Sequence, residues 1–142
     1  MPPTEIPPDT LAAYLNTDYR FGQGAEVVTL RIDTRSEALQ WLYTWTGHRC
    51  GVFITTHNPL GEWQSQEAND DAHARLAAEL KQRGMDAIEG EGVGPDGAWP
   101  AEKSFFVFGV DLETARMLGG RYRQNAVVWA GEDAVPKLIL LR

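Results

Sequence analysis

The chain has 142 residues, of which 43% are hydrophobic and 23% charged, a composition typical of a folded globular domain and unlike that of a disordered segment. The longest apolar run, 105–110, is far shorter than the about 20 residues that cross a membrane. A formal net charge of -7 at pH 7 disfavours nucleic acid and anionic membranes as partners, since both attract basic surfaces. The one cysteine, Cys50, excludes an internal disulfide, so we expect a cytoplasmic protein.

The first half of the chain predicts alternating strands and helices. Residues 1–12 are rich in proline, so we expect a flexible lead-in followed by one α/β domain over 13–142. Alternating apolar residues predict a half-buried strand over 26–32, and a capping box that begins at Thr34 predicts a helix that ends at Gly47. Residues 51–55, apolar on both faces, are typical of a central strand.

The second half continues this pattern. It predicts a helix within 65–83, a weak strand at 87–91, a flexible loop at 92–97, a central strand at 105–108, a helix at 112–118 and two final strands at 126–129 and 138–141. The loop matches G-x-G-x-x-G, but no helix follows it, which argues against a dinucleotide site. The element order predicts an α/β (α+β) fold, a single mixed β-sheet with about three helices packed on it, in which 51–55, 105–108 and 126–129 are the most buried strands.

Motifs that identify a reaction are missing from the sequence. It contains no P-loop, no H-E-x-x-H, no C-x-x-C pair and no G-x-S-x-G elbow. His57, His73, Cys50 and Glu62 match no compact ligand spacing, so we expect no metal site. The cofactor, the oligomeric state and whether the protein is an enzyme stay open.

Polar residues at strand ends are the best candidates for a site. Asn58 follows the strand at 51–55, Glu102 and Ser104 precede the strand at 105–108, and Gln124 precedes the strand at 126–129. In open α/β sheets, ligands collect at the ends of central strands. Trp99, three residues before Glu102, could stack on a ligand. The local alternative is that these side chains only form turns and strand edges.

Five short motifs in order resemble the bacterial family called domain of unknown function 3293. They are Tyr14-x-x-Thr17-x-Tyr19-Arg20, Ile54-Thr55-Thr56-His57-Asn58-Pro59, Asn69 near the start of a helix, Trp99-x-x-Glu102-x-Ser104-Phe105 and Gln124-x-Ala126. The resemblance runs from about Tyr14 to the C-terminus. It implies no activity, cofactor or substrate, but it nominates Tyr19, Asn58, Asn69, Glu102, Ser104 and Gln124. The chain departs from the family at Leu60-Gly61-Glu62, where we expect a hydroxyl residue after Asn58-Pro59.

Two functions remain as hypotheses. In the first, a pocket binds a small polar molecule, with Glu102 as catalytic acid or base, Asn58, Asn69, Ser104 and Gln124 as hydrogen-bonding residues, and Tyr19 or Trp99 stacked on the ligand. In the second, the chain is a non-enzymatic module that binds a protein partner through its acidic surface and exposed aromatic residues such as Trp63. The polar residues then form a structural network.

Overall fold

The computed structural model describes residues 4–22, 24–95 and 100–142. The strands are β1 (Asp18–Phe21), β2 (Val28–Leu30), β3 (Gly51–Thr55), β4 (Ala87–Val93), β5 (Glu102–Phe108), β6 (Ala126–Ala130) and β7 (Pro136–Leu140). The α-helices are α1 (Pro8–Leu15), α2 (Glu37–Thr46), α3 (Gln66–Gln82) and α4 (Leu112–Arg121). Two 3-10 turns, η1 (Gly24–Glu26) and η2 (Pro59–Gly61), complete the described elements.

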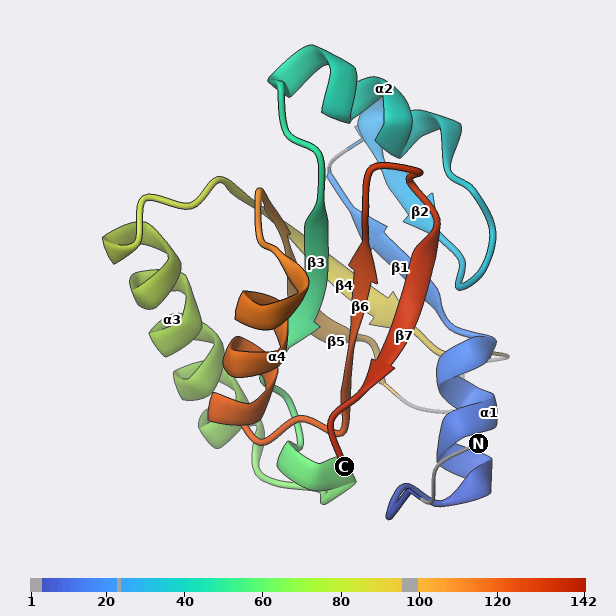
Figure 1. The fold of residues 1–142 in the computed structure, drawn as a ribbon. Helices are drawn as coiled ribbons and strands as arrows, with labels where there is room; N and C mark the ends of the chain where they lie inside the picture. The colour runs from blue at the N-terminus through green and yellow to red at the C-terminus, as the bar shows by residue number, and fades with distance from the viewer. Residues whose placement is uncertain (1–3, 23, 96–99) are drawn as a thin grey trace.

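The strands form a 7-stranded sheet in the order β2-β1-β4-β5-β3-β6-β7 (Figure 1). The predicted α/β fold, one sheet with helices packed on it, is confirmed. All described pairs are antiparallel, however, where the sequence analysis expected a mixed sheet. The reason is that each helical crossover skips an odd number of strands. α2 connects β2 to β3 across β1, β4 and β5. α3 connects β3 to β4 across β5, and α4 connects β5 to β6 across β3, which is the split β-α-β arrangement of ferredoxin-like folds.

The three strands that the sequence predicted to be the most buried, β5, β3 and β6, lie side by side in the sheet, and none of them is an edge strand. Their side chains alternate between two apolar cores, one on each face. Val52, Ile54, Phe105 and Val107 face one core, and Phe53, Phe106 and Phe108 face the other. Burial on both faces explains why 52–54, 105–108 and 126–130 are apolar at every position.

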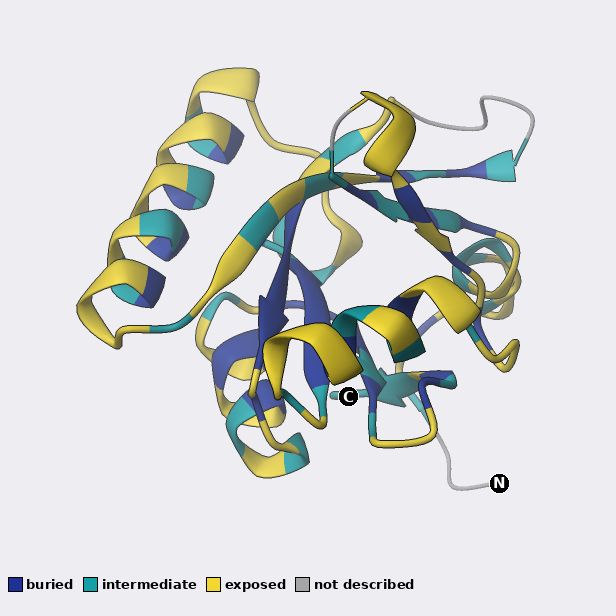
Figure 2. Ribbon diagram, turned by 90° about the horizontal axis from the view of Figure 1, so that it is seen from above, coloured by how far each residue is buried: buried dark blue, intermediate teal, exposed yellow. Residues whose placement is uncertain are grey.

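Helices α3 and α4 cover the first face of the sheet (Figure 1). α3 begins after Ser65, whose Oγ accepts a hydrogen bond from Ala68 N at 3.1 Å. Leu76 and Leu80 on its inner side are buried in the core, and Figure 2 shows this buried side turned toward the sheet. Helix α4 extends through the glycine pair that was predicted to end it. An added Cβ at Gly119 would lie 2.5 Å from Leu141 Cδ1 and 2.8 Å from Val127 Cγ1, so a larger residue there would displace these side chains.

Helices α2 and α1 belong to the second face, and Figure 1 shows them toward opposite ends of the sheet. α2 buries Leu39 and Tyr43, and Tyr43 Oη donates to Ala130 O at 2.9 Å. The cap of α2 is Ser36, whose Oγ accepts from Leu39 N at 3.1 Å. The capping box predicted at Thr34 therefore starts two residues too early.

The N-terminal region differs most from the sequence analysis. Residues 8–15 form α1, although residues up to 12 were assigned to a flexible lead-in. Pro8 occupies the first turn of α1, where its fixed φ and missing N–H favour a helix. β1 was not predicted, because four residues are too few to reveal alternation. Tyr19 and Phe21 are nevertheless buried in it.

Among the described residues, no helix combines the length and the apolar character that crossing a bilayer requires.

Candidate functional site

Asn58, Glu102 and Gln124 meet at one edge of the sheet. Asn58 follows the end of β3, Glu102 begins β5, and Gln124 lies two residues before β6. β5 and β6 flank β3 and both run antiparallel to it, so the end of β3 meets the beginnings of both neighbours. The sequence analysis expected this convergence from the rule for open α/β sheets. Antiparallel pairing produces it here.

Side-chain amides fix the loop that follows β3. Asn58 has a left-handed backbone with φ 45°, a conformation that asparagine tolerates better than most residues. Its backbone N–H donates to Asn69 Oδ1 at 2.9 Å, and Asn69 Nδ2 donates to Asn58 Oδ1 at 3.2 Å. Gln64 N also donates to Asn58 Oδ1, at 3.1 Å. With its oxygen held in this way, Asn58 Nδ2 donates to Glu102 Oε2 at 3.1 Å.

The carboxyl group of Glu102 is partly buried and has no cationic partner in the described part of the chain. Burial raises its pKa, and the hydrogen bond from Asn58 opposes that shift. A glutamate with a raised pKa can accept or donate a proton closer to neutral pH than an exposed one.

A cavity of about 350 Å³ lies between α1 and the second face of the sheet. Its wall is largely apolar, with polar side chains from the strand ends. The polar residues that line it include Asp9, Thr10, Tyr14, Thr17, Tyr19, Thr55, His57, Asn58, Glu102, Ser104 and Gln124, and the apolar ones include Ala13, Phe53, Ala126, Val128 and Leu138. An apolar cavity with a few convergent polar groups is the usual form of a small-molecule site.

Four hydroxyl groups of the lining donate their hydrogen to backbone carbonyls. The bonds are Thr17 Oγ1 to Ala13 O at 2.7 Å, Tyr19 Oη to Tyr14 O at 2.7 Å, Thr55 Oγ1 to Lys103 O at 2.8 Å and Ser104 Oγ to Glu102 O at 3.0 Å. Gln124 Nε2 likewise donates to His57 O at 3.2 Å and to Tyr122 O at 3.3 Å. These donors therefore all bind backbone carbonyls, and the side-chain oxygens of Ser104 and Gln124 can still accept a hydrogen bond.

Tyr14, on α1, covers the cavity. Its hydroxyl oxygen accepts from Asn125 Nδ2 at 3.1 Å, and Arg142 Nη1 donates to Asn125 Oδ1 at 2.8 Å. Burial raises the pKa of Tyr14, the bond from Asn125 lowers it, and the negative charge of Glu102 raises it further. Tyr14 was part of a motif in the sequence but not one of the candidates, because only the fold brings α1 onto the sheet.

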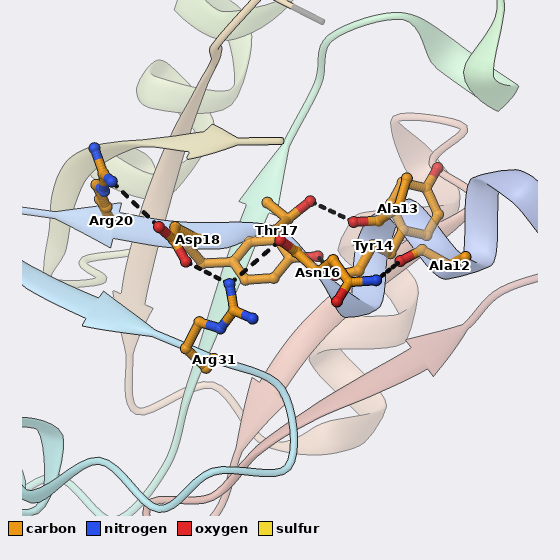
Figure 3. A network of polar contacts seen from close by, with 9 residues as sticks. Ala12, Ala13, Tyr14, Asn16, Thr17, Asp18, Arg20 and Arg31 are labelled. Atoms are coloured by element: carbon orange, nitrogen blue, oxygen red, sulfur yellow. Dashed lines mark hydrogen bonds and ion pairs between the residues drawn. The ribbon is translucent and has the colours of Figure 1, made fainter. Parts of the chain in front are cut away.

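A polar network fixes the junction between α1 and β1 (Figure 3). The carboxylate of Asp18 accepts from Arg31 at 2.6 Å and from Arg20 at 3.2 Å, and Arg31 also donates to Asn16 O at 3.2 Å. The Arg31 bond lowers the pKa of Asp18, desolvation by burial opposes this shift, and the Arg20 bond adds to it. Together with the Thr17 bond to α1, these contacts set where α1 lies above the cavity.

The candidate residues divide into three groups. Tyr19, Asn58, Glu102, Ser104 and Gln124 all line the cavity. Asn69 does not, and acts on Asn58 instead. Trp99 lies outside the described residues. The sequence analysis placed Glu102 and Ser104 before a strand, whereas both are within β5, facing the same side as Phe106.

Residues that the candidate set missed include Thr55 and Trp63. Thr55 is the last residue of β3, and the period of two that places Phe53 on this face places Thr55 there as well. Trp63 lines the cavity while its side chain is 72% exposed, which places it at the cavity mouth. In the alternative hypothesis from the sequence, Trp63 is one of the exposed aromatic residues that bind a protein partner.

A second polar group lies near the cavity, on the side of α3. The rings of His57 and His73 are 6.3 Å apart, and both Nδ1 atoms are buried without a hydrogen-bond partner. Burial lowers the pKa of His57, and the neighbouring His73 adds to this effect. Within the described residues, no three side chains of histidine, cysteine, aspartate or glutamate gather in a way that could hold a metal ion.

The fold and the cavity define an α/β protein with a polar-ended pocket on one face of an antiparallel sheet. The model of a family described as "Protein of unknown function (DUF3293)" matches residues 54–127, just over half of the chain, and the protein belongs to this family. The matched segment includes Asn58, Asn69, Glu102, Ser104 and Gln124. No curated protein and no solved structure gives a significant match.

Proposed function

We propose that the protein binds a small polar molecule in the cavity beneath α1, with Glu102 as the group that pairs with it or exchanges a proton with it. The observation that carries this proposal is a partly buried carboxyl group at a cavity wall with no cationic side chain beside it. Burying a carboxylate costs free energy, and a residue with a purely structural role would not need to carry that charge. A ligand that pairs with Glu102 would recover that free energy.

Ligand binding can be tested by filling the cavity from α1. Ala13 lines the cavity and Ala12, its neighbour, is exposed, so Ala13→Leu and Ala12→Leu add the same side chain to the same helix in different places. In a metabolite screen by melting shift, we expect a ligand that stabilises wild type and Ala12→Leu but not Ala13→Leu. A ligand at 100 times its Kd stabilises by about 2.7 kcal/mol, which such a screen detects readily.

Glu102→Gln tests the role of the carboxyl group with the volume kept. We expect the ligand found in the screen to bind this variant at least about tenfold more weakly, since a hydrogen bond to a charged group contributes about 1.5–3 kcal/mol. Equal binding by wild type, Glu102→Gln and Ala13→Leu would contradict the proposed site.

A second candidate function is supported by an exposed aromatic pair on α2. Trp41 and Trp45 are 61% and 76% exposed, and their rings stack at 5.4 Å. Exposed tryptophans are frequent in protein interfaces. This function is favoured if no ligand shifts the wild type while Glu102→Gln lowers the melting temperature sharply, because the polar cluster would then be structural.

A further inference from the structure

Most of the polar side chains that line the cavity can accept a further hydrogen bond but cannot donate one. The hydroxyl hydrogens of Thr17, Tyr19, Thr55 and Ser104 are all used on backbone carbonyls. Glu102 Oε1, Gln124 Oε1 and Ser104 Oγ accept no hydrogen bond from a described residue. Tyr14 is an exception, because its oxygen accepts from Asn125 and its hydrogen remains available. Thr10 and His57 are two more, since the Thr10 hydroxyl and His57 Nδ1 have no hydrogen-bond partner among the described residues.

The charges around the cavity have the same bias. The lining contains the carboxyl groups of Asp9 and Glu102 and, among the described residues, no lysine or arginine. Its one imidazole is that of His57, and burial lowers the pKa of this ring, which favours the neutral form. Arg142 lies behind Asn125 and is held there by Asn125 Oδ1, Leu60 O and Glu5. An anionic ligand would therefore meet a carboxylate and unoccupied acceptors, with few donors to satisfy its own oxygens.

Aromatic side chains form part of the wall. Tyr14, Tyr19, Phe53 and Trp63 all line the cavity, and the faces of such rings attract cations. A protonated amine has three donors and no acceptor, so it matches a site in which most donors are already used. The volume of about 350 Å³ also leaves room for an apolar body beside the charged group.

We infer that the cavity takes a small organic cation, a protonated amine on an apolar body, with the ammonium group on Glu102. This inference rests on the proposed function and specifies its ligand class. Glu102 is the anionic partner, the oxygens of Ser104 and Gln124 accept the remaining ammonium hydrogens, and the apolar body lies against Phe53 and Val128.

Two matched series of probes test this ligand class at pH 7. One has an aromatic body (benzylamine, benzyl alcohol, benzoate) and the other a linear body (butylamine, butanol, butyrate). We expect calorimetry to show that the amine of at least one series binds wild type at least tenfold more tightly than its alcohol, and that the carboxylate binds most weakly. Glu102→Gln should remove the preference for the amine. Glu91→Gln, an exposed glutamate on β4, should preserve it.

The outcomes separate the two proposals. If the alcohol or carboxylate binds as tightly as its amine, and Ala13→Leu abolishes that binding, the cavity is a ligand site but the cation inference is wrong. An amine preference that persists in Glu102→Gln also overturns it. If none of the six probes binds and the metabolite screen is negative too, the proposed function falls together with the inference.

Discussion

Both the oxygen and the nitrogen of the Asn69 side-chain amide form hydrogen bonds with the loop after β3. Its oxygen accepts from the backbone N–H of Asn58 and from Gln64 Nε2, at 2.9 and 2.7 Å, and its nitrogen donates to Asn58 Oδ1. Asn58 is thereby oriented so that its own nitrogen meets Glu102. Asn69 is a positioning residue, and its effect on Glu102 passes through the single donor that Asn58 provides.

Glu102→Gln should have little cost in stability at pH 7. The glutamine oxygen can still accept from Asn58 Nδ2, and the variant has no carboxylate to desolvate. Folding raises the pKa of Glu102 above its ordinary value of 4.5, so ionisation destabilises the folded wild type at pH values above the raised pKa. We therefore expect Glu102→Gln to be at least as stable as wild type at pH 7, with any advantage disappearing as the pH falls to 4.5.

Urea unfolding of both proteins between pH 4.5 and 7 measures this difference. If the free energy of unfolding of Glu102→Gln were lower than that of wild type by about 1–3 kcal/mol at pH 7, the amide would be mismatched with its hydrogen-bonding partners, and the carboxylate would have a structural role instead.

At the scale of elements, strand β4 approaches β1 closely at one glycine and loosely at another. An added Cβ at Gly90 would overlap Arg20 O and lie 2.9 Å from Phe21 Cβ. At Gly92, two residues along the same face, the nearest atom would be Thr17 Cγ2 at 3.8 Å, an ordinary contact. Gly90 lets β1 pair with β4, and β1 leads directly from α1, so this approach also determines where the cavity cover lies.

Gly90→Ala and Gly92→Ala form a matched pair for this approach. We expect Gly90→Ala to destabilise the protein by about 1–3 kcal/mol, because backbone atoms must move to admit the methyl group. Gly92→Ala should change the free energy of unfolding by less than about 0.5 kcal/mol. Chemical unfolding at one pH measures both, and equal effects would show that β1 is not packed as closely as the structure has it.

At the scale of the whole molecule, the charge distribution bears on possible partners. The chain has 20 acidic and 13 basic residues. Several of the basic side chains pair with carboxylates, among them Arg31 with Asp18, Arg83 and Arg121 with Glu79, and Lys137 with Asp33. The described surface therefore presents little cationic charge that could track a phosphate backbone.

We accordingly expect no appreciable binding to duplex DNA or RNA at physiological salt. An anisotropy titration with a labelled 20-base-pair duplex checks this, with a basic nucleic-acid-binding protein as the positive control. A Kd below about 1 µM, tighter than typical non-specific binding, would contradict the prediction.

The central strands and the main helices could be predicted because their signals are local. Residues 52–54 and 105–108 are apolar at every position, and α3 has a four-residue apolar period with Ser65 as its cap. β1 and α1 could not be predicted in the same way. They are short, and what stabilises them is packing on distant residues, such as Tyr19 against Phe53 at 5.3 Å.

By itself, the sequence determined the fold class, the identity of the three central strands and most of the polar side chains at the candidate site. These features could be predicted because the local pattern of residues indicates which segments are buried and where strands end. Only the tertiary structure decided that the sheet is antiparallel, because the skipping of β5 and β3 by the crossovers through α3 and α4 depends on strand pairings far apart in the chain. It also decided that Tyr14 covers the cavity and that its hydroxyl oxygen accepts from Asn125 Nδ2. Those contacts arise only when α1 is packed on the sheet, which no local pattern of residues specifies.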